Sequence, residues 1–437
     1  MKRDFRSTLL KWKQHPLRTP LIVRGARQVG KTFAIEAFGK DSFKNLSLLN
    51  FEESPQFQHC FETMDPRSII DQIGLISQKK IIPGETLLFL DEIQQCPKAL
   101  QSLRYFKEKL PELHLIAAGS LLEFAIRDEG FSFPVGRVQF AKMYPVSFGE
   151  YLDACGDTAI RESLALSDCL NLPSSALHNH LLKRVKEYFI IGGMPSAVQT
   201  FLQTKSILEV KYVQKALWDA FESDFGKYAK KTQHRHLKKI FEEVPRLIGD
   251  HIKYSRIDPE IPNPARDIKQ AIELLRMAGL LHPIYATSAG SLPLLTGLKE
   301  AIFKLLFLDI GMVDQVMNID PQYPGLMTGP LAEQFVGQEL LAAADPFLDT
   351  RLFFWDRDNG SAEVDYLMAH KGIVYPIEVK AGKAGSLKSL HLFIKEKKAP
   401  FGIKISQAPL EWDKGILSLP FYLVAHLPRL IDHLKDL

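Results

Sequence analysis

A chain of 437 residues is too long for one hydrophobic core, and its length indicates two to four domains. Its hydrophobic fraction of 46% and charged fraction of 24% are those of an ordinary globular protein. A net charge of +4 permits nucleic-acid binding without arguing for it.

Cysteine usage and hydropathy narrow the setting. The four cysteines, Cys60, Cys96, Cys155 and Cys169, form no C-x-x-C pair, so we expect reduced thiols and neither a zinc site nor a disulfide framework. The start of the chain lacks the continuous apolar segment of a signal peptide. No apolar run approaches the about 20 residues that a membrane helix needs. These features predict a cytoplasmic protein that does not contact a membrane.

The first region, residues 1–150, alternates apolar strand candidates with helix candidates. Such alternation predicts an α/β fold, in which helices cover a parallel sheet. The strand candidates are PLIV at 20–23, LSLLNF at 46–51, TLLFL at 86–90, LHLIAAG at 113–119 and RVQFAKMYPVSF at 137–148, and the helix candidates are 31–40 and 97–110.

A phosphate-binding loop follows the first strand. The segment GARQVGKT matches G-x4-G-K-[ST] once in the chain, between a strand and a helix, which is the context that the chemistry requires. Backbone N–H groups of such a loop approach phosphates, the lysine reaches the β- and γ-phosphates, and the hydroxyl binds Mg²⁺. A plain strand-to-helix turn is the alternative. The nucleotide-binding residues predicted here are Gly25, Ala26, Arg27, Gln28, Val29, Gly30, Lys31, Thr32 and Asp91.

The third strand candidate ends in Asp91 and Glu92. We expect Asp91 to hold the hydrated Mg²⁺ beside Thr32, and Glu92 to orient and deprotonate the attacking water. An acidic helix start is the alternative, because carboxylates also favour that position. Together with the loop, the acidic pair predicts binding and hydrolysis of ATP.

Two more polar residues complete the expected catalytic set. Ser120 follows the fourth strand candidate and is placed to contact the γ-phosphate or the water, although a polar strand end explains it equally well. Arg137 begins the fifth strand candidate and is a candidate arginine finger, acting within the chain or across a subunit boundary. An exposed arginine is the other interpretation. A finger acting across subunits would imply a homo-oligomer.

The middle of the chain changes character. Residues 151–235 show mainly helical spacing, and residues 236–300 combine helices with a hairpin around a Gly-Ser turn, a pattern that suggests a winged-helix module. Between Lys227 and Arg256, nine Lys or Arg outnumber three acids. This excess is compatible with contacts to a DNA or RNA backbone, and also with a solvated helix face.

The last region, 301–437, contains two short strands in the segment EVDYLMAHKGIVYPIEVK. Strand alternation puts Glu363 and Asp365 on one face, and Glu378 and Lys380 on one face. A short symmetric turn around 371–372 then sets Asp365 opposite Glu378, and Glu363 opposite Lys380. The (D/E)-x-K triplet occurs four times in the chain, so this register carries the prediction and the triplet alone does not.

Two facing carboxylates repel one another unless a divalent cation or a proton lies between them. Oxygen ligands suit Mg²⁺ or Mn²⁺, so we expect a second metal at Asp365 and Glu378. Lys380 would steady the attacking water or the developing charge of a cleaved phosphodiester. In the alternative, the domain has the same fold but no metal-dependent catalysis. Glu363 and Lys380 then form an exposed ion pair, and the acids are solvated.

The motifs together resemble a known family. The loop, the strand ending in Asp-Glu, AAGSLLE, GR, YPVSFGEYL and GGMP look like the prokaryotic AAA-superfamily ATPases with a C-terminal domain of unknown function; KLLFLDIG, AEQFVGQEL, EVDYL and PIEVKAG look like that end domain. The resemblance implies an AAA-like core with an additional strand between the two nucleotide-binding strands, consistent with 46–51. It also implies a winged helix and an end domain of the PD-(D/E)XK nuclease fold.

For the end domain, the resemblance suggests a further acid on the helix at 329–340: Glu333 first, Glu339 second. The proline of the nuclease signature is missing, since Val364 precedes Asp365. We expect an ATPase whose turnover drives the winged helix and the nuclease-like domain on nucleic acid. Two alternatives stay open: a metal-dependent nuclease that ATP licenses, and a nucleotide-gated binding protein with a catalytically dead docking domain.

Overall fold

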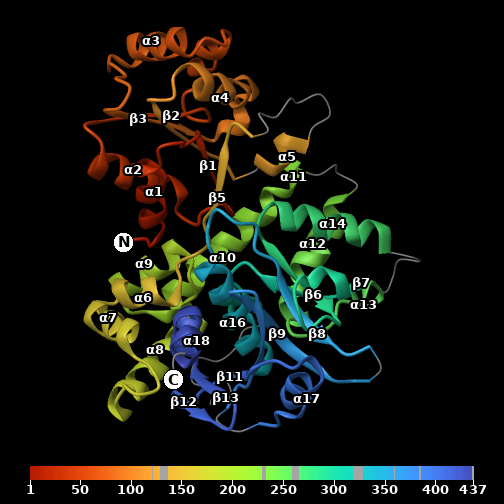
Figure 1. Ribbon diagram of the computed structural model, residues 1–437. Coiled ribbons are helices and arrows are strands. Elements are labelled where there is room, and N and C mark those ends of the chain that lie inside the picture. The colour runs from red at the N-terminus through yellow and green to blue at the C-terminus, as the bar shows by residue number, and fades with distance from the viewer. Residues whose placement is uncertain are drawn as a thin grey trace. The chain divides into compact units, whose positions relative to one another are not determined.

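The structure is a computed structural model that describes residues 1–120, 122–127, 136–228, 233–257, 265–317, 328–358, 360–382 and 385–435. The chain folds into two compact units (Figure 1). Unit 1 comprises Met1–Tyr144 and Asp345–Asp349, and unit 2 comprises Pro145–Ala344 and Thr350–Leu437. Within these described ranges, no helix is both long and apolar enough to cross a bilayer.

Unit 1 is built on a five-stranded parallel sheet, which confirms the predicted α/β class. Each of the five strand candidates contributes one strand: β1 (Leu21–Arg24), β2 (Asn45–Asn50), β3 (Thr86–Asp91), β4 (His114–Ala118) and β5 (Gln139–Lys142). Every residue of β3 and β4 is buried, as expected for strands covered on both faces.

Helices cover both faces of this sheet. In Figure 1, α1 and α2 lie on one side of the strands, and α3 and α4 lie on the other. The helical segments are α1 (Phe5–Gln14), α2 (Lys31–Ser42), α3 (Pro66–Ser77), α4 (Pro97–Lys109) and α5 (Leu122–Arg127), with 3-10 turns at Pro55–Phe61 and Ile93–Gln95.

The strand order is β2-β3-β4-β1-β5. The additional strand between the two nucleotide-binding strands β1 and β3 is therefore β4. The segment 46–51, which the sequence suggested for that place, is mostly β2 and lies at the edge of the sheet beside β3. The order of the strands along the chain does not predict their order in the sheet, because the crossovers of a parallel sheet need not join neighbouring strands.

Unit 2 contains an eight-stranded mixed sheet in the order β12-β13-β11-β10-β9-β8-β6-β7. The hairpin that suggested a winged helix supplies β6 and β7, which are the last two strands of this large sheet and not a separate wing. The strands are β6 (Leu281–Thr287), β7 (Leu298–Phe307), β8 (Leu352–Asp356), β9 (Glu363–His370), β10 (Ile373–Val379), β11 (Gly402–Ser406), β12 (Glu411–Asp413) and β13 (Ile416–Pro420).

The β9–β10 hairpin has the predicted register. Ile373 pairs with His370, and the pairing continues without a shift to Ile377 opposite Tyr366. The two turn residues Lys371 and Gly372 both have positive φ, 47° and 82°. Positive φ at both positions fits the strand twist of a type I′ turn, which explains why so short a loop fixes the register.

Helices of unit 2 pack around this sheet (Figure 1). They are α6 (Phe148–Ala154), α7 (Thr158–Leu166), α8 (Ser175–Ile191), α9 (Pro195–Thr204), α10 (Ile207–Ser223), α11 (Phe225–Tyr228), α12 (His234–Glu243), α13 (Tyr254–Ile257), α14 (Ala265–Met277), α15 (Ile310–Met317), α16 (Gly329–Ala343), α17 (Lys388–Lys397) and α18 (Leu427–Lys435), with 3-10 turns at Val244–Leu247, Leu294–Gly297 and Phe421–His426.

The GGMP and FLDIG motifs meet in the core of unit 2. The buried carboxylate of Asp309 accepts hydrogen bonds from the backbone N–H groups of Gly193 at 2.6 Å and Gly311 at 3.1 Å. The side-chain amide of Gln338 on α16 also donates to it, at 3.3 Å. Burial raises the pKa of Asp309 to about 6. These motif residues therefore join three separate segments of unit 2.

Candidate functional site

The phosphate-binding loop lies at the carboxyl end of β1. Its backbone requires glycine at Gly25, where φ is +144° and an added Cβ would meet the carbonyl oxygen of Met143 at 2.2 Å. Gly30 precedes α2 with φ 91°, also in the left-handed region. The loop therefore turns sharply into the amino end of a 12-residue helix, where backbone N–H groups and the helix dipole favour an anion.

Lys31 is the buried cation of this loop. Its side chain is 7% exposed, and Nζ donates to the carbonyl oxygens of Gly25 at 2.9 Å and Ala26 at 2.8 Å. Burial lowers the pKa of Lys31 to about 8, and the carboxylates of Glu92 and Asp91 only partly oppose the shift. The ammonium group thus has neutral hydrogen-bond partners, and it would gain most from a bound anion.

Thr32 and Asp91 meet as the sequence predicted. The Thr32 hydroxyl donates to Asp91 Oδ2 at 2.8 Å, and Asp91 Oδ1 accepts from the backbone N–H of Glu92 at 3.1 Å. Burial raises the pKa of Asp91. A hydroxyl and a carboxylate side by side are hard oxygen donors, so these two residues fit a hydrated Mg²⁺.

Glu92 has a partner that sequence reasoning missed. Gln94 Nε2 donates to Glu92 Oε2 at 2.5 Å, and a Cβ added to Gly119 would meet Gln94 Oε1 at 2.2 Å. Gln94 therefore lies between the acidic pair and the segment after β4, which ends in Ser120. The sequence feature that could have indicated this contact is the polar residue Gln94, two positions after the expected base Glu92.

Arg137 lies at the other end of the strands, away from the phosphate-binding loop. β5 runs parallel to β1 with Gln139 beside Leu21, so Arg137 precedes the amino ends of the strands, whereas the loop follows the carboxyl end of β1. At about 3.3 Å per residue, the four-residue strand β1 alone separates the amino and carboxyl ends of the strands by about 13 Å. Arg137 instead donates to Glu108 at 3.1 Å. The structure does not bring it to the phosphate loop of its own chain.

In unit 2, the predicted acids come from three elements that approach one another. Glu333 lies on α16, Glu363 and Asp365 on β9, and Glu378 on β10. Asp365 Oδ2 accepts from the backbone N–H of Val379 at 2.7 Å. We call Glu333, Glu363, Asp365 and Glu378 the acidic cluster.

Lys304 pairs with acids of this cluster, and the sequence analysis did not predict it. It lies on β7, is 3% exposed, and its Nζ is 3.2 Å from Glu333 Oε2 and also forms an ion pair with Glu363 Oε1. Burial alone would lower the pKa of Lys304, but Glu333, Glu363 and Asp365 outweigh burial and raise it. A single lysine in the apolar strand segment AIFKLLF was the available signal.

The Glu363–Lys380 ion pair of the alternative interpretation does not form. Lys380 Nζ lies 2.6 Å from Oε1 of Glu378, two residues earlier in the chain, while Glu363 Oε2 lies 2.7 Å from His251 Nε2. Lys304 takes Glu363 instead, because a lysine side chain can reach across a sheet face between strands that are not neighbours. Strand alternation predicts only neighbouring contacts.

Within the described residues, the acidic cluster is not arranged as a set of three or more metal ligands. Burial and Asp365 raise the pKa of Glu333 to about 8 and that of Glu378 to about 7, so protons and two lysines already balance the carboxylates. Among the residues that the structure describes, no group of three or more His, Cys, Asp or Glu is arranged to hold a metal. The second-choice acid Glu339 instead accepts from the backbone N–H of Phe148 at 3.0 Å.

The basic stretch after 227 is partly neutralised. Lys238 lies 2.5 Å from Glu222, and Lys239 lies 3.4 Å from Glu243. Residues 229–232 of this stretch lie outside the described residues.

Three family models match successive parts of the chain. An AAA domain matches residues 17–152, and two domains of unknown function, DUF8612 and DUF4143, match residues 182–323 and 328–423. The match over 17–152, together with the loop between β1 and α2 and the Thr32–Asp91 hydrogen bond, makes this part of the chain a P-loop ATPase domain of the AAA type. No curated protein matches the chain.

Solved structures with similar folds are distant. A Walker-type ATPase of Pyrococcus abyssi is 15% identical, with coverage of 72% of this chain and 95% of that one and a TM-score of 0.46. The ORC2 protein of Aeropyrum pernix is 12% identical, with coverage of 72% and 94% and a TM-score of 0.35. The RuvB Holliday-junction branch-migration motor of Thermotoga maritima is 14% identical, with coverage of 64% and 89% and a TM-score of 0.29. These TM-scores are too low for a functional inference.

Proposed function

We propose that unit 1 binds ATP with Mg²⁺ and hydrolyses it. The observation that carries this proposal is the buried ammonium of Lys31, whose hydrogen-bond partners are neutral carbonyls that a triphosphate would replace or supplement. Thr32 and Asp91 hold the metal, which neutralises charge on the phosphates, and Glu92 orients and deprotonates the attacking water. The backbone of Gly25, Ala26, Arg27, Gln28, Val29 and Gly30 surrounds the phosphates.

Measurement of ATP binding and turnover by the purified chain tests this proposal. Lys31→Ala should lose nucleotide binding, because the loop then lacks its only buried cation at the phosphate position. Lys40→Ala is the matched control: it changes an exposed lysine of the same helix, which pairs with Glu36. A wild-type chain that hydrolyses no ATP, with or without DNA or RNA, contradicts the proposal.

Arg137 and Ser120 complete the proposed catalytic set in different ways. Ser120 follows β4, which lies between β1 and β3. It therefore lies at the carboxyl ends of the strands, where the phosphate-binding loop also lies, and can contact the γ-phosphate or the water. Arg137 lies at the opposite, amino ends of the strands and is exposed. We therefore assign it to the site of a neighbouring copy in a homo-oligomer, where an arginine finger stabilises transition-state charge.

Mixing of two inactive variants tests the assignment of Arg137. Glu92→Gln removes the base from its own site, and Arg137→Ala removes the finger from a neighbouring site. In a mixed oligomer, some sites regain both groups, so turnover should rise above that of either variant alone. Mixtures no more active than the separate variants argue against a finger that acts across subunits.

Unit 2 is proposed to be the part that ATP turnover drives, with nucleic acid as its partner. Its nuclease-like acids serve as a docking element and not as a catalyst, because the buried Lys304 already supplies the positive charge that a metal would bring. A nuclease is the second candidate, and the register that faces Asp365 toward Glu378 favours it.

Cleavage assays separate these two candidates. Single- and double-stranded DNA and RNA are incubated with the full chain, ATP, and Mg²⁺ or Mn²⁺. We expect no cleavage. Metal-dependent nicking that disappears in Asp365→Ala and Glu378→Ala would overturn the docking role and establish the nuclease.

A further inference from the structure

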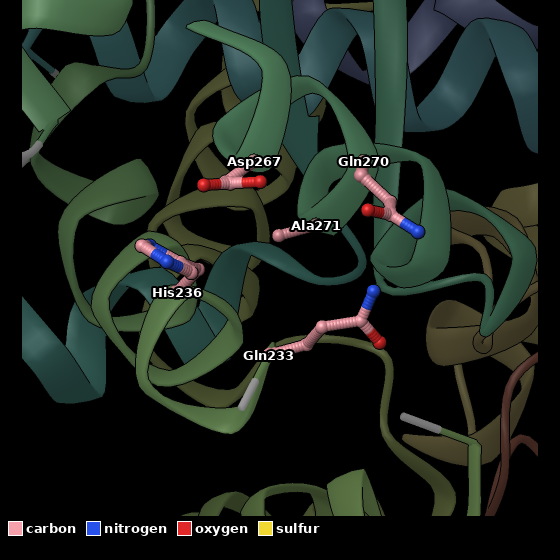
Figure 2. A pocket seen from close by; sticks show the side chains of 5 residues that line it. All are labelled: Gln233, His236, Asp267, Gln270 and Ala271. Carbon is pink, nitrogen blue, oxygen red and sulfur yellow. The ribbon is translucent and has the colours of Figure 1, made fainter. Parts of the chain in front are cut away.

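A small hollow lies in unit 2 between the beginnings of α12 and α14. Its volume is about 220 Å³, and it is lined by Gln233, His236, Asp267, Gln270 and Ala271. In Figure 2, the carboxamides of Gln233 and Gln270 lie on one side of the hollow, His236 and Asp267 lie on the other, and Ala271 lies between them. This volume is below the roughly 300–1,000 Å³ of pockets for drug-sized ligands, so it suits a smaller fragment.

The lining has unused hydrogen-bonding capacity. The side chains of His236 and of the exposed residues Asp267 and Gln270 form no hydrogen bond with a side chain or backbone group of the described ranges, and His236 Nδ1 is buried without a partner. The primary amides both donate and accept, and the carboxylate accepts. A ligand that satisfied these groups would itself present donors and acceptors at close spacing.

Charge distinguishes the hollow from its rim. No Lys or Arg among the described residues lines it, and Asp267 is acidic, so this described lining disfavours a phosphate group. Arg266 and Lys269 are exposed on the same helix, one position away from lining residues, and pair with no acid in the described part of the chain. This arrangement fits a ligand whose uncharged polar group enters the hollow and whose phosphodiester lies outside it, near Arg266 and Lys269.

We propose that this hollow binds one unpaired base of a single-stranded nucleic acid, with Gln270 and Asp267 contacting the base edge and Arg266 and Lys269 contacting the backbone. Glutamine pairs with adenine through two hydrogen bonds, and aspartate accepts from the cytosine amino group. A base within a duplex cannot enter a hollow of this kind without leaving the stack, so the ligand is a single strand. The inference rests on the proposed nucleic-acid role of unit 2 and specifies how a strand is held.

Binding of labelled single-stranded DNA by the full chain tests the proposal through fluorescence anisotropy. Oligonucleotides of one base type are compared with a strand of the same length that carries abasic positions, and with a duplex. We expect the abasic strand to bind about 5- to 100-fold more weakly than the preferred base. Gln270→Ala and Asp267→Ala should remove this difference, and Asp267→Asn should change the preferred base, because it replaces an acceptor with a donor.

Controls keep this test independent of folding and of ATP turnover. Gln203→Ala changes an exposed glutamine on α9 and should leave binding unchanged, and all variants should keep the wild-type rate of ATP hydrolysis. Arg266→Ala should weaken binding equally for base-bearing and abasic strands and reduce its salt dependence.

Three outcomes overturn the base site while leaving the ATPase proposal intact. They are equal binding of abasic and base-bearing strands, unchanged binding by the Gln270 and Asp267 variants, and displacement of the strand by an equal concentration of mononucleotide. The absence of binding to any nucleic acid would instead overturn the proposed role of unit 2, which the parallel ATPase measurement distinguishes.

Discussion

Among the residues that the structure describes, each unit contains one lysine that is almost completely buried, and the two lysines have opposite surroundings. Lys31 has carbonyl partners, and burial lowers its pKa to about 8. Lys304 has carboxylate partners, which raise its pKa despite the burial. A buried charge that the chain leaves without a strong counter-charge indicates a ligand site. A buried charge that the chain itself balances indicates a structural role.

This contrast also explains why acidic residues have different meanings in the two units. Asp91 and Glu92 end a strand beside a loop that is prepared for an anion, so their oxygens are available to a metal and a water. Glu333 and Glu363 already share the ammonium of Lys304. The same residue type is therefore expected to be catalytic in unit 1 and structural in unit 2.

The largest expected effect compares the same change at both sites. Glu92→Gln should lower ATP turnover by about 10²- to 10⁴-fold with nucleotide binding retained, because the water loses its base. Glu378→Gln should leave turnover near the wild-type rate. Steady-state hydrolysis and nucleotide titration measure both. A Glu92→Gln chain with normal turnover would remove the catalytic half of the comparison.

Loss of the balancing lysine should destabilise unit 2. Lys304→Met leaves Glu333 and Glu363 buried without their cation, and breaking a buried ion pair in this way costs about 3–5 kcal/mol in the free energy of unfolding. Hydrogen exchange of peptides from β7 and β9 measures the loss. The double variant Lys304→Met/Glu363→Gln should recover part of it, since it also removes one unpaired carboxylate. An unchanged stability in the single variant would show that Lys304 is not the balancing charge.

The corresponding change in unit 1 should behave differently. Lys31→Met should not destabilise the nucleotide-free chain and should stabilise it near neutral pH, since it removes a buried charge whose pKa the fold lowers and which has no strong counter-charge to lose. The wild-type chain should gain about 2.7 kcal/mol at an ATP concentration 100 times the dissociation constant, and the variant should gain nothing. Thermal unfolding with and without ATP and Mg²⁺ measures both quantities. A variant that ATP still stabilises fully would contradict the role of Lys31.

Local features of the chain were predictable from the sequence. The five strands of unit 1, the loop Gly25–Thr32 and the Thr32–Asp91 contact follow from short-range patterns with strict geometric demands. The β9–β10 register follows from alternation and a two-residue turn at Lys371-Gly372. In each case the decisive residues are close in sequence or their spacing is set by backbone chemistry.

Contacts across the sheets were not predictable. The position of β4 between β1 and β3, the approach of Gln94 to Gly119, and the location of Arg137 at the far edge depend on how crossovers order the strands. Lys304 reaches Glu363 although β7 and β9 are not neighbours in the sheet. Such pairings depend on tertiary packing, which periodicity does not encode.

The smallest expected effect is a difference in the pH dependence of the two lysines. The unfolded chain keeps a proton on lysine up to 10.5, whereas folded Lys31 releases it near 8. Between these values the unfolded state binds more protons, so the Lys31 contribution to stability rises with pH. From about pH 7.5 to about pH 9 it should increase by about 1 kcal/mol.

Lys304 has the opposite sign: its raised pKa gives stability that is fully present below 10.5 and is lost only above it. Because Glu333 beside Lys304 has a pKa of about 8, Lys304→Met is compared in the Glu333→Gln background. The stability difference made by Lys31→Met should then change across this pH range, and that made by Lys304→Met should not. Hydrogen exchange of peptides from each unit, corrected for the intrinsic pH dependence of exchange, separates the two. Parallel pH profiles for both variants would mean that the two buried lysines have similar surroundings, and the distinction between a ligand site and a structural ion pair would then fail.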